Sequence, residues 1–253
     1  MMFTKTRRFA LVTAMLWLAF GVGGRAVADL ELSTPGGLSP GDTFRFVFLT
    51  DGTTTATSSN ISDYNTFVTN DASTQAGGGV VTYNGVTLTW SAIASTSTVN
   101  AIDNVGQTMT PVYLADGTLV TTSTTLSGLW SGSLVQPINE DLNGKRSTTE
   151  VSVWTGTTAS GVVSTDGWLG SDLPLLGQSE RTSSKWVDDQ DLTEADDEKL
   201  NMYGISQVLT VVPEPSTLLM AGTGISAGIA YGWFRRRRDQ RRQRPVGLTD
   251  AIE

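Results

Sequence analysis

The densest group of residues that could do chemistry is an acidic run from Asp188 to Glu198. Its carboxylates suit calcium, which takes about six to eight oxygen ligands in proteins. The best candidates for such ligands are Asp188, Asp189 and Asp191. No window of the run combines the central glycine, the final glutamate and the alternating acids of an EF-hand loop. A calcium loop is therefore an alternative to a solvated acidic loop, and no other cofactor is predicted.

The chain contains no histidine and no cysteine. Ser-His-Asp and Cys-His catalysis, histidine or thiolate zinc sites and haem ligation by these residues are therefore excluded. A pair of carboxylates could still hydrolyse a glycosidic bond, but no pair stands out among the acids. We expect a protein that is not an enzyme, with a carboxylate-based glycan-acting enzyme as a distant alternative.

Charge is distributed very unevenly along the chain. Residues 29–211 hold six basic and 21 acidic residues, a net charge of about −15. Nucleic acid is therefore not an expected partner, because a nucleic-acid-binding surface must be basic. With no cysteine, this part of the chain must be stabilised by its core, by bound ions or by neighbours.

The pattern of apolar residues predicts a β-rich domain with two short helices. Thr43–Leu49 reads as a strand, and Val80–Trp90 reads as a hairpin around Asn-Gly. Apolar residues recur at helical spacing from Ile61 to Val68 and, more weakly, from Val99 to Val105, which predicts two short helices. A second hairpin is expected at Val112–Val120. The predicted order is strand, helix, hairpin, helix, hairpin.

The carboxyl half of this domain has fewer signals. Val151–Trp154 alternates like a strand, and Met202–Val212 reads as a closing strand. The segment between them is expected to be a long loop, a feature that is usually functional or disordered. We assign Trp154 to the core. Trp168, within the loop, is either a core residue or a surface on which a sugar ring stacks.

The amino terminus has the features of a secretory signal peptide. Basic residues among the first eight positions precede an apolar run, Phe9–Gly23. Ala26 and Ala28 then supply the small-residue pattern that signal peptidase cleaves. We predict a signal peptide over residues 1–28 and a mature protein that begins at Asp29.

The carboxyl terminus contains a predicted membrane span. Ser216–Phe234 carries no charge, and as a helix of 19 residues it would cover roughly 28 Å, close to the thickness of a bilayer core. A basic cluster beside a span stays on the cytoplasmic side. Its first members are Arg235, Arg236, Arg237 and Arg238.

A Pro-Glu-Pro triplet, Pro213, Glu214 and Pro215, precedes this span and should be extended, because proline does not fit a helix interior. The triplet, the span and the arginines, in this order, resemble the PEP-CTERM sorting tail. The resemblance implies processing by an exosortase near the triplet. It also implies a precursor in the inner membrane with a cytoplasmic carboxyl terminus, and a product at the cell surface or in the extracellular matrix.

The order of elements in the domain resembles endostatin-like domains, which have the C-type-lectin-like fold. The segments that carry this likeness are Phe44–Leu49, Val112–Gly117, Ser152–Gly156, Gly177–Ser179 and Val208–Thr210. The likeness implies a single α+β domain whose first and last strands are neighbours. The cysteines of that fold and the zinc-binding histidines of endostatin are absent, so disulfides and zinc do not transfer.

These features divide the chain into four parts: a signal peptide (1–28), an exported domain (29–211), a sorting signal (212–238) and a cytoplasmic tail (239–253). We expect a non-catalytic component of the cell envelope or extracellular matrix, in a pathway linked to exopolysaccharide. The alternative is a lectin-type module that binds carbohydrate through the loop after Trp154. Expected partners are signal peptidase, exosortase and the membrane, and exopolysaccharide is a further candidate.

Overall fold

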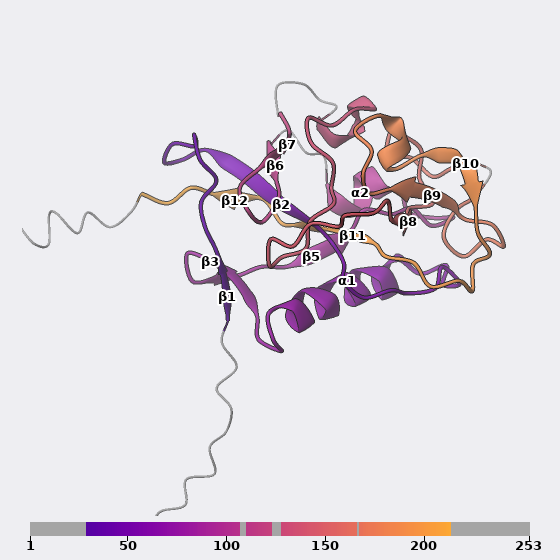
Figure 1. The fold of residues 1–253 in the computed structure, drawn as a ribbon, viewed down its shortest axis with the longest axis horizontal. Helices are drawn as coiled ribbons and strands as arrows, with labels where there is room; N and C mark the ends of the chain where they lie inside the picture. The colour runs from indigo at the N-terminus through magenta and orange to yellow at the C-terminus, as the bar shows by residue number, and fades with distance from the viewer. Residues whose placement is uncertain (1–28, 107–109, 123–127, 166, 214–253) are drawn as a thin grey trace, which may run out of the picture.

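The computed structural model describes residues 29–106, 110–122, 128–165 and 167–213. Within them the largest sheet has the strand order β5-β11-β2-β6-β7, and β12 also pairs with β2 (Figure 1). Its strands are β2 (Thr43–Leu49), β5 (Trp90–Ala92), β6 (Val112–Tyr113), β7 (Leu119–Thr121), β11 (Tyr203–Ser206) and β12 (Leu209–Thr210).

Two smaller sheets lie toward opposite ends of the molecule in Figure 1. One contains β1 (Leu30–Leu32), β3 (Val81–Tyr83) and β4 (Val86–Thr87); the other contains β8 (Ser152–Trp154), β9 (Leu175–Gln178) and β10 (Asp189–Thr193). The helices are α1 (Ile61–Gln75) and α2 (Ala101–Val105), with 3-10 turns η1 (Gly128–Ser131) and η2 (Ser184–Trp186). The β-rich fold with two helices that the sequence predicts is thus confirmed, while the C-type-lectin-like topology stays a prediction.

Strand β2 occupies the middle of the large sheet and is buried on both faces. Phe44, Phe46 and Phe48 point into one hydrophobic core, whereas Val47 and Leu49 point into the other. This explains why the strand is nearly continuously apolar instead of alternating with polar residues.

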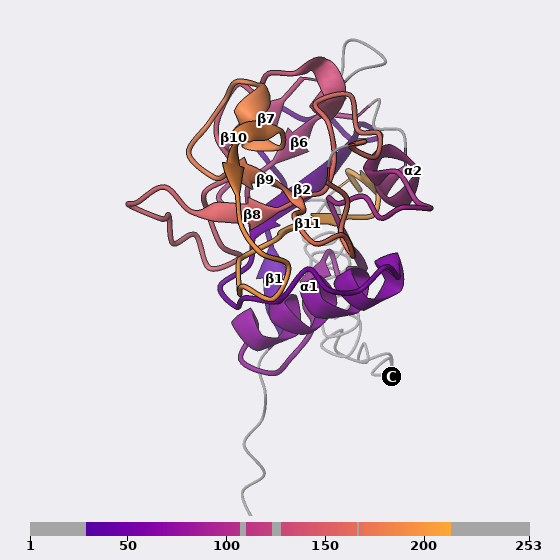
Figure 2. The same cartoon turned by 90° about the vertical axis from the view of Figure 1, so that its right-hand side faces the viewer.

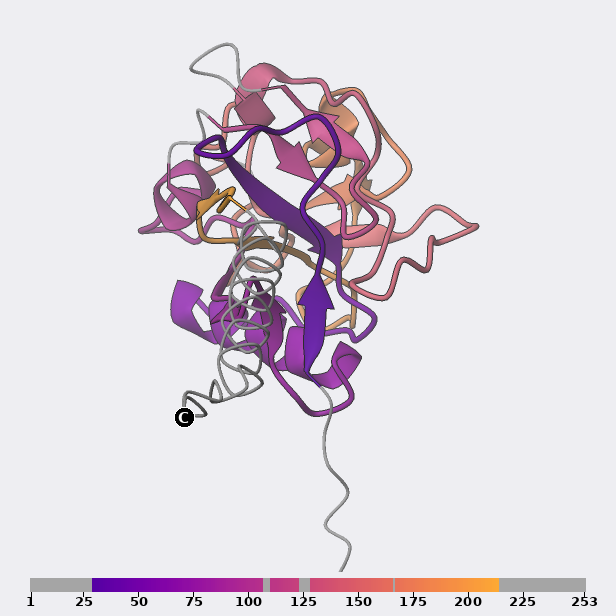
Figure 3. The same cartoon turned by 90° about the vertical axis from the view of Figure 1, so that its left-hand side faces the viewer.

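The first and last long strands of the domain are hydrogen-bonded neighbours. β2 pairs antiparallel with β11, where Leu49 faces Tyr203, and with β12, where Phe44 faces Leu209. Figure 3 shows β2, in indigo, beside the orange and yellow strands of the carboxyl end. The sequence prediction that these strands are neighbours is confirmed.

The one charged residue of β2, Arg45, is 4% exposed and lies among backbone carbonyls. Its Nε donates to the carbonyl oxygen of Ser206 at 2.6 Å, and its Nη1 donates to that of Val105 at 2.6 Å. Because Val105 is the last residue of α2, the guanidinium satisfies a carbonyl that the short helix leaves unpaired. Burial lowers the pKa of Arg45 to about 10, which leaves the side chain charged at neutral pH.

Helix α1 begins where the sequence predicts and continues beyond the predicted end, to Gln75. The Asn60 side chain accepts a hydrogen bond from the backbone N–H of Ser62, as an N-cap does. Tyr64, Val68 and Ala72 form the buried face of the helix. Figure 2 shows α1 lying along one side of the large sheet, against which this face packs.

Both predicted hairpins are present, as β3 with β4 and as β6 with β7. The predicted order of strand, helix, hairpin, helix and hairpin is also found. Asn84 and Gly85, between β3 and β4, have φ values of 49° and 73°. Two consecutive positive values are typical of the tight turn that Asn-Gly favours. The strand β1, which pairs parallel with β3, was not predicted.

The expected long loop between Trp154 and Met202 is wrong in part, because it contains β9 and β10, which extend a sheet from β8. All four residues of β9 are buried, so the strand lacks the alternation by which a half-buried strand is recognised. At Gly177 an added Cβ would lie 2.1 Å from the carbonyl oxygen of Trp186. Glycine is therefore required where η2 crosses β9.

The predicted closing strand is interrupted in the structure. β11 ends at Ser206, and β12 begins at Leu209. Between them the Gln207 side chain accepts a hydrogen bond from the backbone N–H of Thr89, at 2.6 Å. This contact draws the chain toward the segment before β5, so that two short strands replace one long strand.

Trp154→Ala should lower the free energy of unfolding by about 3 to 5 kcal/mol. The Trp154 side chain is fully buried, and its Nε1 donates to the carbonyl oxygen of Thr54 at 2.9 Å. Urea unfolding measures the change. Trp168 is only half-buried, so Trp168→Ala is the matched control and should cost about 1 kcal/mol or less. Equal losses in the two variants would contradict this assignment of the core.

Candidate functional site

An open pocket of about 290 Å³ lies where β2 ends. One wall is the end of β2 and the turn after it, and the other is the segment that follows Asn139. The residues lining it are mostly polar: Leu49, Thr50, Asp51, Asn139, Asp141, Lys145, Arg146, Ser147, Thr148, Thr149, Val151 and Asn201.

The first wall is held by a carboxylate from α1. The buried side chain of Asp71 accepts hydrogen bonds from the backbone N–H of Gly52, at 2.8 Å, and of Asp51, at 3.2 Å. Burial raises the pKa of Asp71, against the lowering effect of these hydrogen bonds. The Asn201 side chain also donates to the carbonyl oxygen of Thr50 at 2.6 Å. The turn that presents Asp51 to the pocket is thus held from two directions.

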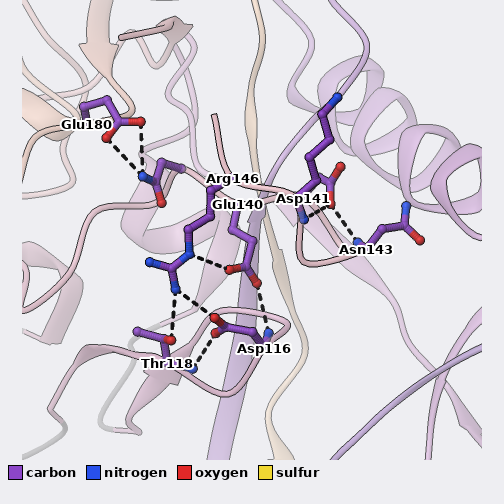
Figure 4. Close-up of polar contacts among 9 residues, drawn as sticks. Asp116, Thr118, Glu140, Asp141, Asn143, Arg146 and Glu180 are labelled. Atoms are coloured by element: carbon purple, nitrogen blue, oxygen red, sulfur yellow. Dashed lines mark hydrogen bonds and ion pairs between the residues drawn. The ribbon is translucent and has the colours of Figure 1, made fainter. Parts of the chain in front are cut away.

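The second wall is anchored by an ion-pair network around Arg146 (Figure 4). Its Nε donates to Glu140 at 3.0 Å, and its Nη2 donates to Asp116 at 2.7 Å and to Thr118 at 3.1 Å. The Glu140 side chain is fully buried and also accepts from the backbone N–H of Asp116, at 3.0 Å. The backbone carbonyl of Glu140 accepts from the N–H of Leu49 at 2.8 Å, which joins the network to β2.

Asn139 stands between this network and a second carboxylate. Its Nδ2 donates to both carboxylate oxygens of Glu180, at 3.0 and 3.1 Å. Its Oδ1 is buried and has no hydrogen-bond partner among the described residues. A buried acceptor without a protein partner points to a donor supplied by an enclosed water molecule.

The two acids of the network have pKa values shifted in opposite directions. Burial raises the pKa of Glu140, and the neighbouring Asp116 charge adds to this effect. Burial also opposes ionisation of Asp116, but hydrogen bonds from Thr118 and Arg146 outweigh it and lower the pKa of Asp116 to about 2. The hydrogen bonds from Arg146 and from backbone N–H groups hold both side chains as structural acceptors.

Asp116→Asn should flatten the acid side of the stability profile. A carboxylate whose pKa falls from 3.8 to about 2 on folding stabilises the fold above its ordinary pKa. It loses that contribution as the pH falls through about 2. The Asp116 side chain is 36% exposed, so its net contribution at pH 7 is about 1 kcal/mol after solvent screening.

The measurement is urea unfolding at a series of pH values from 7 to 2, with the exposed Asp197 changed to Asn as the control. Wild type and the control should lose stability more steeply than Asp116→Asn below about pH 4. Identical slopes in all three proteins would contradict the role of the network.

The acidic run that predicts calcium is partly engaged by a lysine. Lys185 Nζ lies 3.0 Å from Asp189 and 2.6 Å from Asp191. The Asp188 side chain accepts from the backbone N–H of Ala159 at 3.2 Å. Within the described ranges, no three acidic residues are grouped so that they could hold a metal ion. Calcium binding at this run stays the alternative to a solvated acidic loop, and the Lys185 ion pairs compete with it.

We expect millimolar calcium and EDTA to give the same melting temperature at moderate salt. Lys185 already neutralises part of the charge of Asp189 and Asp191, so a cation would have to displace it. Differential scanning calorimetry decides the point, with Lys185→Met as the comparison. A higher melting temperature in calcium would support the loop as a calcium site.

The structure separates the other predicted site residues from the polar pocket. Trp154 is buried in the core, as predicted. Trp168 is half-buried and does not line the pocket. The sequence interpretation missed Asn139, Glu140 and Arg146. The signal available for them was Lys145-Arg146, which is the only adjacent basic pair between residues 29 and 211.

The domain ends immediately before the predicted sorting triplet. Val211 is buried, and Val212 and Pro213 are exposed. A protein-family model, the PEP-CTERM protein-sorting motif, matches residues 211–238. The chain carries a PEP-CTERM sorting motif. This finding confirms the resemblance seen in the sequence, and no curated protein matches the chain.

The PEP-CTERM motif implies processing by exosortase and sorting to the surface. Several predicted positions lie outside the described residues: Ala26, Ala28, Glu214, Pro215, the span 216–234 and the four arginines from Arg235 to Arg238. Among the residues that are described, no helix is long and apolar enough to cross a membrane.

Proposed function

We propose that the exported domain is a non-catalytic component of the cell envelope or extracellular matrix, delivered by exosortase in a pathway linked to exopolysaccharide. The proposal includes a precursor in the inner membrane whose carboxyl terminus is cytoplasmic. Its main support is the PEP-CTERM motif at residues 211–238, because the motif directs sorting.

The junction between the domain and the motif carries the argument. The backbone N–H of Val211 donates to the carbonyl of Asp42, and the carbonyl of Val211 accepts from the N–H of Gly41, both at 2.9 Å. Val212 and Pro213 follow and are exposed. Cleavage near the triplet would therefore break none of the hydrogen bonds that close the domain, and a complete domain would be released.

Glu140 and Asp116, the two carboxylates that are hydrogen-bonded to Arg146, support a non-catalytic role. Glu140 and Asp116 are both engaged by Arg146 and by backbone N–H groups. A glycosidase needs one carboxyl group free to protonate the leaving group and another free to act as base or nucleophile. We keep a carboxylate-based glycan-acting enzyme as a distant alternative.

The second candidate is a lectin-type carbohydrate-binding module. It is favoured by the open pocket at the end of β2, whose lining residues are mostly polar. This surface differs from the loop after Trp154, where the sequence predicts binding.

Glu214→Ala should prevent processing, because it removes the only charge of the triplet while leaving the apolar segment and the arginines unchanged. The wild-type product should end near Pro213-Glu214-Pro215, lack Arg235–Arg238 and be found at the cell surface or outside the cell. Mass spectrometry of the surface fraction and of the membrane fraction measures both outcomes.

Asp250→Ala is the matched control, because it removes an acid that lies outside the matched motif. It should be processed like wild type. Surface protein that retains an intact carboxyl terminus through Glu253 would contradict the proposed processing. Normal sorting of Glu214→Ala would contradict the role of the triplet.

A further inference from the structure

The end of the domain has one side in the core and one side in solvent. Leu209 and Val211 are buried, whereas Val208, Thr210 and Val212 are exposed. This alternation is typical of a strand with one solvated face. The solvated face carries no charge, and its two valines are 50% and 56% exposed. We call Val208, Thr210 and Val212 the terminal face.

Charged side chains are scarce around the terminal face. Residues 207–213 contain no charged residue. Residues 33–43, which are hydrogen-bonded to the end of the domain through Gly41 and Asp42, contain Asp42 as their one charged residue. The Asp42 carboxylate accepts from the backbone N–H of Ser39 at 2.7 Å. Contact of this surface with a lipid layer would therefore desolvate little charge.

In the proposed precursor, a very short connection joins the domain to the membrane. The sequence predicts a span that begins at Ser216, in the part of the chain outside the described residues. Pro213, the last described residue, precedes Ser216 by three positions, which reach about 10 Å when fully extended. The headgroup layer on each side of a bilayer is itself about 5 to 7 Å thick. The tether thus brings the end of the domain to the headgroup layer.

We propose that the terminal face docks on the outer surface of the inner membrane in the precursor, with Val208 and Val212 among the lipid headgroups. The inference rests on the proposed function, because it requires a precursor anchored in that membrane. Figure 1 shows the chain leaving the domain beside β12, on the side away from β10. The acidic surface around β10, where the Asp191 side chain is 82% exposed, is therefore directed away from the bilayer.

Docking depends on the tether. One myristoyl chain binds a bilayer with an association constant of only about 10⁴ M⁻¹, and two half-exposed valines bury far less apolar surface than such a chain. The short connection removes most of the entropic cost of bringing the face to the bilayer. Cleavage near the triplet ends this advantage, and the net charge of about −15 on residues 29–211 then favours departure from an anionic membrane. The contact is thus a property of the precursor and is lost on processing.

The experiment uses the full chain, purified in detergent from a host without exosortase and reconstituted into phosphatidylcholine nanodiscs. Because the chain has no cysteine, one fluorophore can be attached at one chosen position. Thr210→Cys places it on the terminal face, and Gln190→Cys places it on the exposed surface of β10. Quenching by nitroxide lipids measures contact with the bilayer, and quenching by iodide measures contact with water.

Two further changes test the valines in the Thr210→Cys protein: Val208→Asp alone, and Val208→Asp together with Val212→Asp. Val135→Asp is the matched control, because Val135 is a valine of similar exposure, 54%, outside the terminal face. Circular dichroism confirms that each variant is folded. The single change keeps the test decisive if the double variant does not fold.

We expect nitroxide lipids to quench the probe at residue 210 and not the probe at residue 190, with the reverse order for iodide. The Val208→Asp variants should lose most of the shielding from iodide, and Val135→Asp should retain it. Equal access of iodide to the two probes, or unchanged shielding in a folded Val208→Asp variant, would overturn the inference. So would shielding that depends on protein concentration, which would show that a second copy covers the face.

The same preparation separates this inference from the proposed function. A chain that does not co-elute with the nanodiscs would contradict the anchored precursor, and the inference would fail with it. A chain that co-elutes while its probe at residue 210 lies in water would contradict the inference alone. Processing is measured separately in cells by the mass of the surface product.

Discussion

The fold depends on burying strand β2 on both faces while both of its edges are paired. Its phenylalanines enter one core, and Val47 and Leu49 enter the other. On its edges it pairs with β6 and with the two closing strands. A chain without cysteine has no covalent link between its ends, so this pairing of early with late sequence is what closes the domain. Aromatic contacts around β2 add packing to this strand pairing; the ring centroids of Phe48 and Trp90, for example, lie 4.9 Å apart.

The polar pocket follows from the position of this strand. β2 ends at Leu49, and the chain must turn where the two cores no longer cover it. The turn is held by Asp71 from α1 and by Asn201 from the segment before β11. The same place receives the segment that contains Glu140, whose carbonyl accepts from Leu49. A pocket forms because three parts of the chain meet at a strand end without filling the space with apolar side chains.

The junction with the sorting motif reflects the same closure. Val211, the last buried residue within the described range, is hydrogen-bonded to the segment that precedes β2, so the exposed Val212 and Pro213 follow the pairing that closes the domain. Val212 and Pro213, which follow Val211, are exposed and make none of the hydrogen bonds that close the domain. Folding and sorting therefore use adjacent but separate parts of the sequence.

The sequence by itself determined the features that depend on neighbouring residues. The helix that begins at Ile61, the Asn84-Gly85 turn, the apolar strand at Thr43–Leu49 and the sorting triplet all rest on local patterns. The absence of histidine and cysteine likewise excluded several chemistries without any structure.

Only the tertiary structure decided which distant residues meet. β9 lacks alternation because it is buried on both faces, and it was therefore predicted as loop. The network of Asp116, Glu140 and Arg146 joins residues about 30 positions apart through a carboxylate whose burial no local pattern announces. The pairing of Asn139 Nδ2 with Glu180, which leaves Oδ1 without a donor among the described residues, likewise joins residues that are far apart in the sequence. Hydrogen-bond satisfaction depends on the whole set of neighbours in space, and a single sequence does not list those neighbours.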